Sequence, residues 1–292
     1  SSELAALEHA LLEVELSDGS IGRAEVAIRP TIYGETLGSV RAGLEYLRPR
    51  LLGLEADDQE GIRAVLEAFP FNFGLKGAID TALGEAWARS EGQELYQVLK
   101  PAKHRVRVAY ILGLGEQDGV LEAARMALGA GVRVFEVKVG RELGLRYVEE
   151  PLPVEEVEAR RALREKGILP LIADDAAMTP KDLRRELALN TFDVLNLKPA
   201  RTGVTWTLEM LALARERGKK AMVGSQAQSA FGAYQSALLA FQQGVTEPCE
   251  LAFHLKAEGG FFPFPPFREG WLYWEDLVEA RFDEEAFARY AL

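Results

Sequence analysis

The chain has 292 residues, 48% of them hydrophobic, which is enough to bury the core of one large domain and one smaller one. Its formal net charge of −11, without any long basic cluster, argues against nucleic acid or an anionic membrane as partner. The single cysteine excludes an intramolecular disulfide framework, and no apolar run reaches the ~18 residues that span a bilayer. We therefore expect a cytoplasmic enzyme.

The first hundred residues predict a small α+β domain. Residues 11–28 alternate apolar and polar positions on both sides of "SDGS", which indicates a β-hairpin with its turn at Asp18 and Gly19. Three stretches with helical spacing or acidic helix starts follow, at residues 34–53, 57–69 and 75–92. Two strands and three helices fit one α+β unit, which we place at residues 1–104.

From residue 105 short apolar strands alternate with helices. Such strands are expected where both faces of a parallel sheet are buried. The predicted strand ends at Glu149, Asp174, Lys198 and Gly224 follow one another at intervals of 25, 24 and 26 residues. A repeat of this size predicts a (β/α)8-type barrel, which we place at residues 105–266. We expect residues 267–292 to pack back on the first domain.

Charged residues end four of the predicted strands: Lys138, Glu149, Asp174 and Lys198. In such barrels the rim at the C-terminal ends of the strands carries the chemistry. Two carboxylates and two lysines on one rim can form a divalent-metal site flanked by acid/base groups, and hard oxygen ligands favour Mg²⁺. This combination suits removal of a proton next to a carboxylate, because the resulting dianion needs strong charge stabilisation.

The motifs "VKVG", "YVEEPLP", "LIADD" and "VLNLKPARTG", in this order, resemble the enolase superfamily and, within it, the muconate lactonizing enzyme subgroup. The resemblance covers nearly the whole chain. It implies a modified (β/α)7β barrel with an α+β capping domain, a Mg²⁺ or Mn²⁺ cofactor and a small-molecule carboxylate substrate; we also expect a homo-oligomer. It implies acid/base roles for Lys138 and Lys198, metal binding by Glu149 and Asp174, and substrate contacts by Asn196, Ser225 and Gln226.

Three positions depart from the motifs of this family. Glu136 stands where the first lysine of a Lys-x-Lys motif is usual, so it could pair with a neighbour or change the selectivity of the metal site. Asp175 replaces the usual glutamate after the metal-binding aspartate. The third metal ligand, an aspartate in an Asp-x-Asn motif, should fall between Lys138 and Glu149, and nothing there matches it.

The link between Lys138 and Glu149 is too short for a parallel barrel. The two residues are 11 positions apart, whereas a parallel crossover needs a dozen or more residues, usually with a helix. We expect at least one strand with its helices to be missing near residues 141–143. Either the protein lacks this segment, or the printed sequence omits it. The second interpretation is favoured because an open barrel would expose its core. From the resemblance we also expect the first capping strand and its mobile substrate loop to be absent from the printed sequence.

The motifs limit the class of reaction but do not identify the substrate. No histidine pairs with an aspartate at a strand end, which disfavours a mandelate racemase-like enzyme. The leading hypothesis is a carbon–oxygen lyase resembling o-succinylbenzoate synthase of menaquinone biosynthesis. N-succinylamino acid racemase, or another racemase or cycloisomerase of the subgroup, is the alternative. Dipeptide epimerases usually carry an acidic motif on the last strand to hold the substrate ammonium. They rank lower here, because Glu258 is the only acidic candidate near that strand. A non-catalytic ligand-binding homologue is the alternative from another class.

Overall fold

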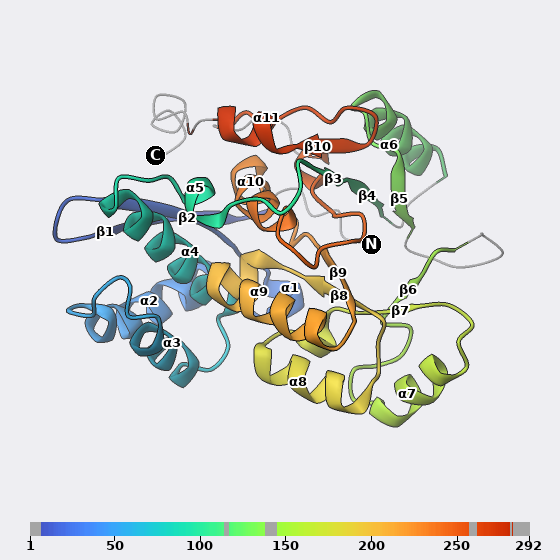
Figure 1. The fold of residues 1–292 in the computed structure, drawn as a ribbon, viewed down its shortest axis with the longest axis horizontal. Helices are drawn as coiled ribbons and strands as arrows, with labels where there is room; N and C mark the ends of the chain where they lie inside the picture. Colours follow the sequence, from blue (N-terminus) through green and yellow to red (C-terminus); the bar gives the residue numbers. More distant parts are fainter. Residues whose placement is uncertain (1–6, 114–116, 138–144, 257–261, 281, 283–292) are drawn as a thin grey trace.

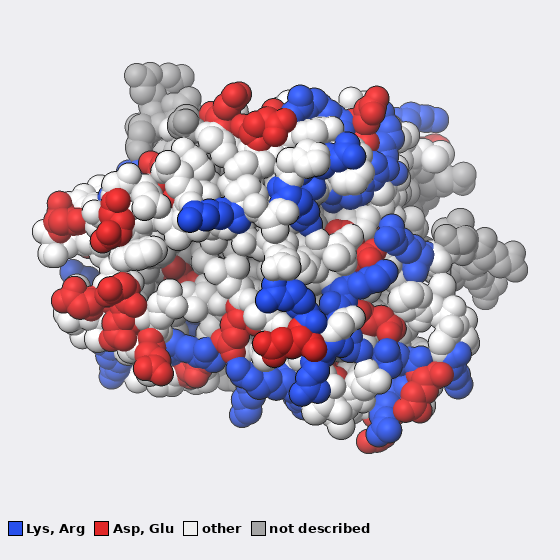
Figure 2. Space-filling model, viewed as in Figure 1, with Lys and Arg blue, Asp and Glu red and all other residues white. Residues whose placement is uncertain are grey.

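The computed structural model describes residues 7–113, 117–137, 145–256, 262–280 and 282. In Figure 1 a hairpin and the helices that follow it occupy one end of the molecule, and strands flanked by helices occupy the other. No helix within the described ranges is long and apolar enough to cross a membrane. On the face shown in Figure 2, Lys and Arg side chains lie among Asp and Glu side chains over α7 (Val157–Glu165), α8 (Pro180–Leu189) and α9 (Pro199–Glu216).

The N-terminal hairpin is formed as expected. β1 (His9–Glu15) pairs antiparallel with β2 (Ile21–Ala27). The helices that follow are α1 (Pro30–Tyr33), α2 (Leu37–Leu51), α3 (Gln59–Ala68), α4 (Phe73–Ser90) and α5 (Leu95–Leu99). Gly22 allows β2 to lie directly on α4, because a Cβ atom there would come 2.0 Å from the Ala82 carbonyl oxygen. Side chains such as Leu47, Leu75 and Ile79 form a separate apolar core in this part.

Parallel strands form the second part of the molecule. β4 (Ala109–Leu112) pairs with β5 (Val134–Val137). A second parallel sheet has the order β6 (Val148–Glu149), β7 (Leu171–Ala173), β8 (Val194–Leu197) and β9 (Lys220–Val223). The intervening helices are α6 (Gln117–Gly129), α7 (Val157–Glu165), α8 (Pro180–Leu189), α9 (Pro199–Glu216) and α10 (Ala230–Ala240). This strand–helix alternation is the predicted α/β architecture.

The chain around Cys249 joins β9 to β4. Cys249 forms a parallel bridge with Val108, and the Glu250 amide donates to the Val223 carbonyl oxygen at 2.8 Å. Residues 249–254, "CELAFH", have the short apolar pattern that predicts the last barrel strand, and this prediction is wrong. The Leu251 amide donates to the Cys249 carbonyl oxygen at 3.0 Å, so the chain turns after a single bridge and continues into the 3₁₀ helix η2 (Phe253–Lys256).

The sheet is interrupted between β5 and β6. Within the described residues no ladder of hydrogen bonds joins these two strands, although β4–β5 and β6–β9 are each continuous. The interruption falls where the sequence predicts a missing strand, near residues 141–143. Residues 138–144 lie outside the described part, and the position of the missing segment stays a prediction.

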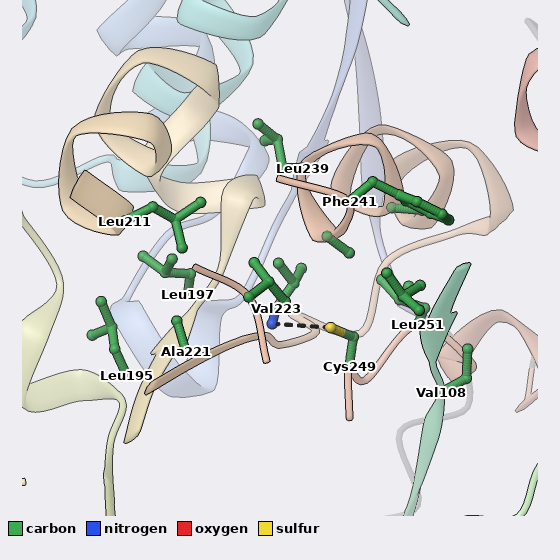
Figure 3. Close-up of a cluster of buried hydrophobic side chains, with 14 of the residues drawn as sticks. Val108, Leu195, Leu197, Leu211, Ala221, Val223, Leu239, Phe241, Cys249 and Leu251 are labelled. Atoms are coloured by element: carbon green, nitrogen blue, oxygen red, sulfur yellow. Dashed lines mark hydrogen bonds between the residues drawn. The ribbon is translucent and has the colours of Figure 1, made fainter. Parts of the chain in front are cut away.

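The core of the barrel lies between the strands and helices α9 and α10 (Figure 3). Leu195 and Leu197 from β8 and Val223 from β9 pack against Leu211 of α9 and Phe241 after α10. The Val223 amide donates to the Cys249 sulfur at 3.4 Å, which ties the closing segment to β9. All of these side chains are buried, so the strands are held by apolar packing on the helix side.

The C-terminal segment contacts both parts of the molecule. β10 (Trp271–Tyr273) pairs antiparallel with β3 (Arg105–Arg107), and α11 (Trp274–Glu279) follows. Phe282 lies under the guanidinium of Arg23 in the N-terminal part, 5.1 Å from ring centroid to Cζ. The described residues of this segment pack mainly beside the first barrel strands. They also reach the N-terminal part, at Phe282 and through the Trp274 amide, which donates to the His104 carbonyl oxygen at 2.9 Å. The domain boundaries stay predictions.

Candidate active site

Three of the four predicted rim residues occupy neighbouring strand ends. Glu149 ends β6, Asp174 follows β7 and Lys198 follows β8, and these strands are adjacent in the sheet. Parallel strands place their carboxyl ends at one edge, so the three side chains share the rim. Lys138, the predicted base, lies outside the described residues.

Two cations bind the carboxylate of Asp174. Lys198 Nζ forms an ion pair with Oδ2, and Arg201 Nη2 lies 2.9 Å from Oδ1. Arg201 also donates to the Asp174 carbonyl oxygen at 2.9 Å and is only 1% exposed. Burial acts to raise the pKa of Asp174, but Arg201 and Lys198 hold it below its ordinary value. Burial acts to lower the pKa of Lys198, and Asp174 raises it above its ordinary value, so the lysine is protonated.

The N-terminal part reaches this ion cluster through one tyrosine. Arg201 Nη1 lies 2.6 Å from Asp175 Oδ1 and donates to the Tyr33 hydroxyl at 3.0 Å. The Tyr33 hydroxyl in turn donates to Asp175 at 3.3 Å. Asp175, a possible site residue in the sequence, therefore links the rim to the end of α1. The charged network spans both parts of the molecule.

Three glutamates converge beside Asp174. Glu136 of β5, Glu149 of β6 and Glu250 of the closing segment each offer a carboxylate oxygen, and these oxygens lie within 4.8 Å of one another. Burial, followed by the Asp174 and Glu136 charges, raises the pKa of Glu149. Burial and the neighbouring Glu136 raise the pKa of Glu250 well above its ordinary value. These carboxyl groups therefore take up protons more readily than Asp174, whose charge is compensated by two cations.

Asn196 contacts this carboxylate cluster through Glu149. Its Nδ2 donates to Glu149 Oε1 at 2.7 Å, whereas its buried Oδ1 has no hydrogen-bond partner in the described part of the chain. Gly224 makes room for the amide, because a Cβ atom there would come 2.1 Å from Asn196 Oδ1. Asn196 is buried, with 1% of its surface exposed, and its hydrogen bond helps to position Glu149. The predicted contact of Asn196 with substrate stays a prediction.

The loop after β9 carries the other two predicted substrate contacts. The Ser225 amide donates to Glu250 Oε2 at 2.9 Å. Arg29, which follows β2, donates through Nε to the Gln226 carbonyl oxygen at 2.7 Å and through Nη2 to the Ala227 carbonyl oxygen. Gln226 Nε2 is buried, with no hydrogen-bond partner in the ranges described. The loop is thus held by the N-terminal part and lies next to Glu250.

The residues of the rim only partly fit the implied metal set. Enzymes of this superfamily use a lysine or histidine base with Mg²⁺, which stabilises the negative charge formed beside the substrate carboxylate. Glu149 fits, since it lies among hard oxygen donors and next to an unsatisfied amide oxygen. Asp174 fits less well, because both of its carboxylate oxygens are already bound by buried cations.

Sequence reasoning missed Glu250, Arg201 and Tyr33. Glu250 carried a usable signal, because it is a further carboxylate 26 positions after Gly224, which continues the same repeat. Arg201 lies in the first turn of α9, three residues after Lys198, where a charged residue is unremarkable on pattern alone. Glu258, the acidic candidate weighed for the last strand, lies outside the described residues.

The fold and the rim define an α/β-barrel enzyme with charged groups at the carboxyl ends of its strands. The family model described as "Enolase C-terminal domain-like" matches residues 127–272. The muconate lactonizing enzyme from Mucobacterium smegmatis, solved with muconolactone, superposes with a TM-score of 0.87 at 25% identity, covering 97% of this chain and 91% of that one. The chain belongs to the enolase superfamily and to its muconate lactonizing enzyme subgroup.

Two curated relatives refine the comparison. The N-succinylamino acid racemase of Thermus thermophilus is 23% identical over 84% of this chain and 81% of its own length. The L-Ala-D/L-Glu epimerase of Bacillus subtilis is 21% identical over 77% of this chain and 75% of its own length. The chain is therefore similar to racemases, epimerases and cycloisomerases, and the fold-class prediction is confirmed.

The Thermus alignment also bears on the short link. It extends over 299 residues but uses 84% of this 292-residue chain, which is about 245 residues. The alignment therefore includes positions that this chain lacks. This agrees with a missing segment without locating it.

Proposed function

We propose that the protein is a racemase or epimerase that inverts the carbon atom α to a carboxylate in an N-acylated amino acid or a dipeptide. The relatives named above support this alternative over the dehydration of an o-succinylbenzoate precursor, because they act by racemisation or epimerisation according to their names. They also lend no support to a non-catalytic homologue. Because one of these relatives is an L-Ala-D/L-Glu epimerase, they also do not support ranking dipeptide epimerases below the other reactions.

One observation carries the proposal: Lys198 lies on the rim as an ammonium, held by Asp174. Inversion needs an acid on one face of the substrate and a base on the other. A protonated Lys198 suits the acid. The base would take the α-proton from the opposite face, and Lys138, implied by the family motif, is the candidate. One proton leaves and one returns, so no net oxidation or hydration accompanies the reaction.

The metal that the superfamily uses would supply positive charge next to the substrate carboxylate. Glu149 is the described residue that best fits its binding. The protein itself contributes the orientation of Lys198, through Asp174 and Arg201, and the fixed loop at residues 225–227.

The test is deuterium exchange. The protein, supplied with Mg²⁺ in D₂O, is incubated with a panel of N-succinylamino acids and dipeptides, and α-deuteration and optical rotation are followed by NMR and polarimetry. We expect deuterium at the α-carbon together with loss of optical purity for one of these classes. Lys198→Ala should remove the inversion, while the exposed Lys166→Ala serves as control.

The competing reaction is tested on the same preparation with the cyclohexadiene precursor of o-succinylbenzoate. Dehydration of this compound, combined with no α-exchange in any amino acid derivative, would overturn the proposal in favour of the lyase.

A further inference from the structure

Two buried charges of the N-terminal part bind the segment between β9 and α10, which we call loop 225–229. Arg29, which follows β2, is 3% exposed, and Glu25, within β2, is 7% exposed. They reach groups of the loop that lie 197 and 204 residues further along the chain. Burying a charge costs free energy unless hydrogen bonds compensate it, so the loop and these two side chains depend on one another.

The guanidinium of Arg29 donates to main-chain carbonyl oxygens. Nε donates to the Gln226 oxygen at 2.7 Å, and Nη2 donates to the Ala227 oxygen. Nη1 donates to the Ile28 oxygen at 2.7 Å, within the N-terminal part. Hydrogen bonds from a charged donor are stronger than those between neutral groups. Because the planar guanidinium presents its donors in a rigid fork, it can hold two successive carbonyl groups of the loop in one orientation.

Ala227 has a backbone conformation that needs such support. Its φ of 57° lies in the left-handed region, which is unfavourable for a residue with a Cβ atom. Conformations of this kind persist only where the surrounding structure enforces them, and they cluster at functional sites. The enforcing contacts are the hydrogen bond from Arg29 to the Ala227 carbonyl oxygen and that from the Ala227 amide to Ser225 Oγ, at 3.1 Å. Without the guanidinium, we expect the loop to leave this conformation.

Glu25 fixes the other end of the loop, where α10 begins. Its carboxylate accepts from the Ser229 amide at 3.0 Å and from the Ser229 hydroxyl, and His9 Nδ1 lies 2.8 Å from Oε1. Helix α10 approaches closely at Gly232, where a Cβ atom would come 2.6 Å from Glu25 Oε1. With Ser229 held here, Arg29 acts on the part of the loop that lies nearer the rim.

That part of the loop carries the two predicted substrate contacts, Ser225 and Gln226. The Ser225 amide donates to Glu250 Oε2 at 2.9 Å, so the loop begins beside the charged rim. The carbonyl group that Arg29 holds on Gln226 belongs to the same residue as one predicted contact. Displacing a group of the site by about 1 Å can lower the rate about 100-fold, even when the mutation lies far from the reacting atoms.

We propose that Arg29 is a positioning residue for the reaction. From the N-terminal part it keeps loop 225–229 in the strained conformation that presents Ser225 and Gln226 to the substrate. Arg29 binds the main chain of the loop and acts through it. The effect on turnover rests on the proposed function, whereas the effect on the loop does not.

Hydrogen exchange of the full chain, followed by mass spectrometry, tests the effect on the loop without any substrate. In Arg29→Ala the amides of residues 225–229 should exchange at least about tenfold faster than in the wild type, because the loop opens locally. Arg89→Ala is the matched control. Arg89 also donates to a carbonyl oxygen of β2, that of Ile21 at 2.6 Å, but its described contacts stay within the N-terminal part. This control should leave exchange in the loop unchanged.

Inversion rates test the effect on turnover. On a substrate that the wild type inverts, we expect Arg29→Ala to lower kcat/KM at least about tenfold. Arg29→Lys should lose less, because it keeps the buried charge but lacks the fork that spans two carbonyl groups. Millimolar guanidinium should restore part of kcat/KM in Arg29→Ala and none in Arg89→Ala.

Several outcomes would overturn the assignment. Loop exchange in Arg29→Ala that equals the wild type would do so, as would equal acceleration in Arg89→Ala. Unchanged kcat/KM in Arg29→Ala, or no recovery with guanidinium, would refute the positioning role. Circular dichroism checks each fold; if Arg29→Ala does not fold, Arg29→Lys must still show faster loop exchange than the wild type. A wild type that inverts no substrate would refute the proposed function, and the exchange measurement would then decide on the loop alone.

Discussion

Arg201 holds Asp174 from inside the protein, with Nη2 2.9 Å from Oδ1 and 2.9 Å from the carbonyl oxygen of the same residue. The contact joins the end of β7 to the start of α9 and leaves the other carboxylate oxygen to Lys198. Because Arg201 also contacts Asp175 and Tyr33, one buried guanidinium connects the rim with the N-terminal part.

We expect Arg201→Met to unfold more easily than the wild type by about 3–5 kcal/mol, because it leaves a buried carboxylate without one of its two partners. Urea unfolding followed by circular dichroism measures this. Arg184→Met is the matched control: Arg184 is 52% exposed and pairs with Glu209, and such surface pairs contribute at most about 1 kcal/mol. Equal losses in the two variants would contradict the structural role given to Arg201.

Tyr33→Phe should lower both stability and turnover modestly. It removes the hydroxyl that bridges Arg201 and Asp175 while keeping the ring, and a hydrogen bond of this kind contributes about 0.5–1.5 kcal/mol. Urea unfolding and initial rates on the substrate found by exchange measure the two effects. The control is Tyr46→Phe, whose ring is 45% exposed on α2. A Tyr33 variant indistinguishable from the Tyr46 variant would show that the bridge is unimportant.

The stability of the protein should fall between pH 6.5 and pH 4 because of His254. Burial lowers the pKa of His254 to about 4, and the ring stacks on Phe264 with centroids 4.2 Å apart. In this window the unfolded chain binds a proton that the folded protein does not, so unfolding is favoured as the pH falls. The contribution is at most about 3 kcal/mol.

The measurement is urea unfolding at several pH values for the wild type, His254→Gln and the exposed His104→Gln. We expect the His254 variant to lose part of the pH dependence and the His104 variant to keep it. A His254 variant with the full wild-type slope would assign the acid sensitivity to the carboxylates instead.

Cys249 should resist thiol reagents in the folded protein. It is completely buried, and burial raises the pKa of its thiol to about 11, so very little thiolate exists at neutral pH. We expect reaction with Ellman's reagent to be slow in buffer and to give one thiol per chain in urea. Because Cys249 lies between β4 and β9, the slow rate reports the opening of this part of the sheet. Rapid labelling of the native protein would show that the sheet opens easily around Cys249.

Much of the architecture follows from local patterns. The turn at Asp18–Gly19 and the alternating residues beside it produce the hairpin, because strand periodicity and turn chemistry act over a few residues. The regular spacing of strand ends predicts Glu149, Asp174 and Lys198 on one rim, and the strands β6, β7 and β8 carry them there. The prediction of a last strand was wrong because a local turn at residues 249–251 competes with pairing to the neighbouring strands. The apolar pattern does not reveal that competition.

The repeat, the fold class and the kinds of charged group at the strand ends can be read from periodicity and residue type alone. Which of these charges meet depends on the folded chain. It pairs Asp174 with Lys198 and Arg201, and it joins Glu250 to Glu136 and Glu149. The physical reason is that an ion pair or a metal site depends on separations of a few ångströms between atoms far apart in the chain, and closure of the sheet sets those separations.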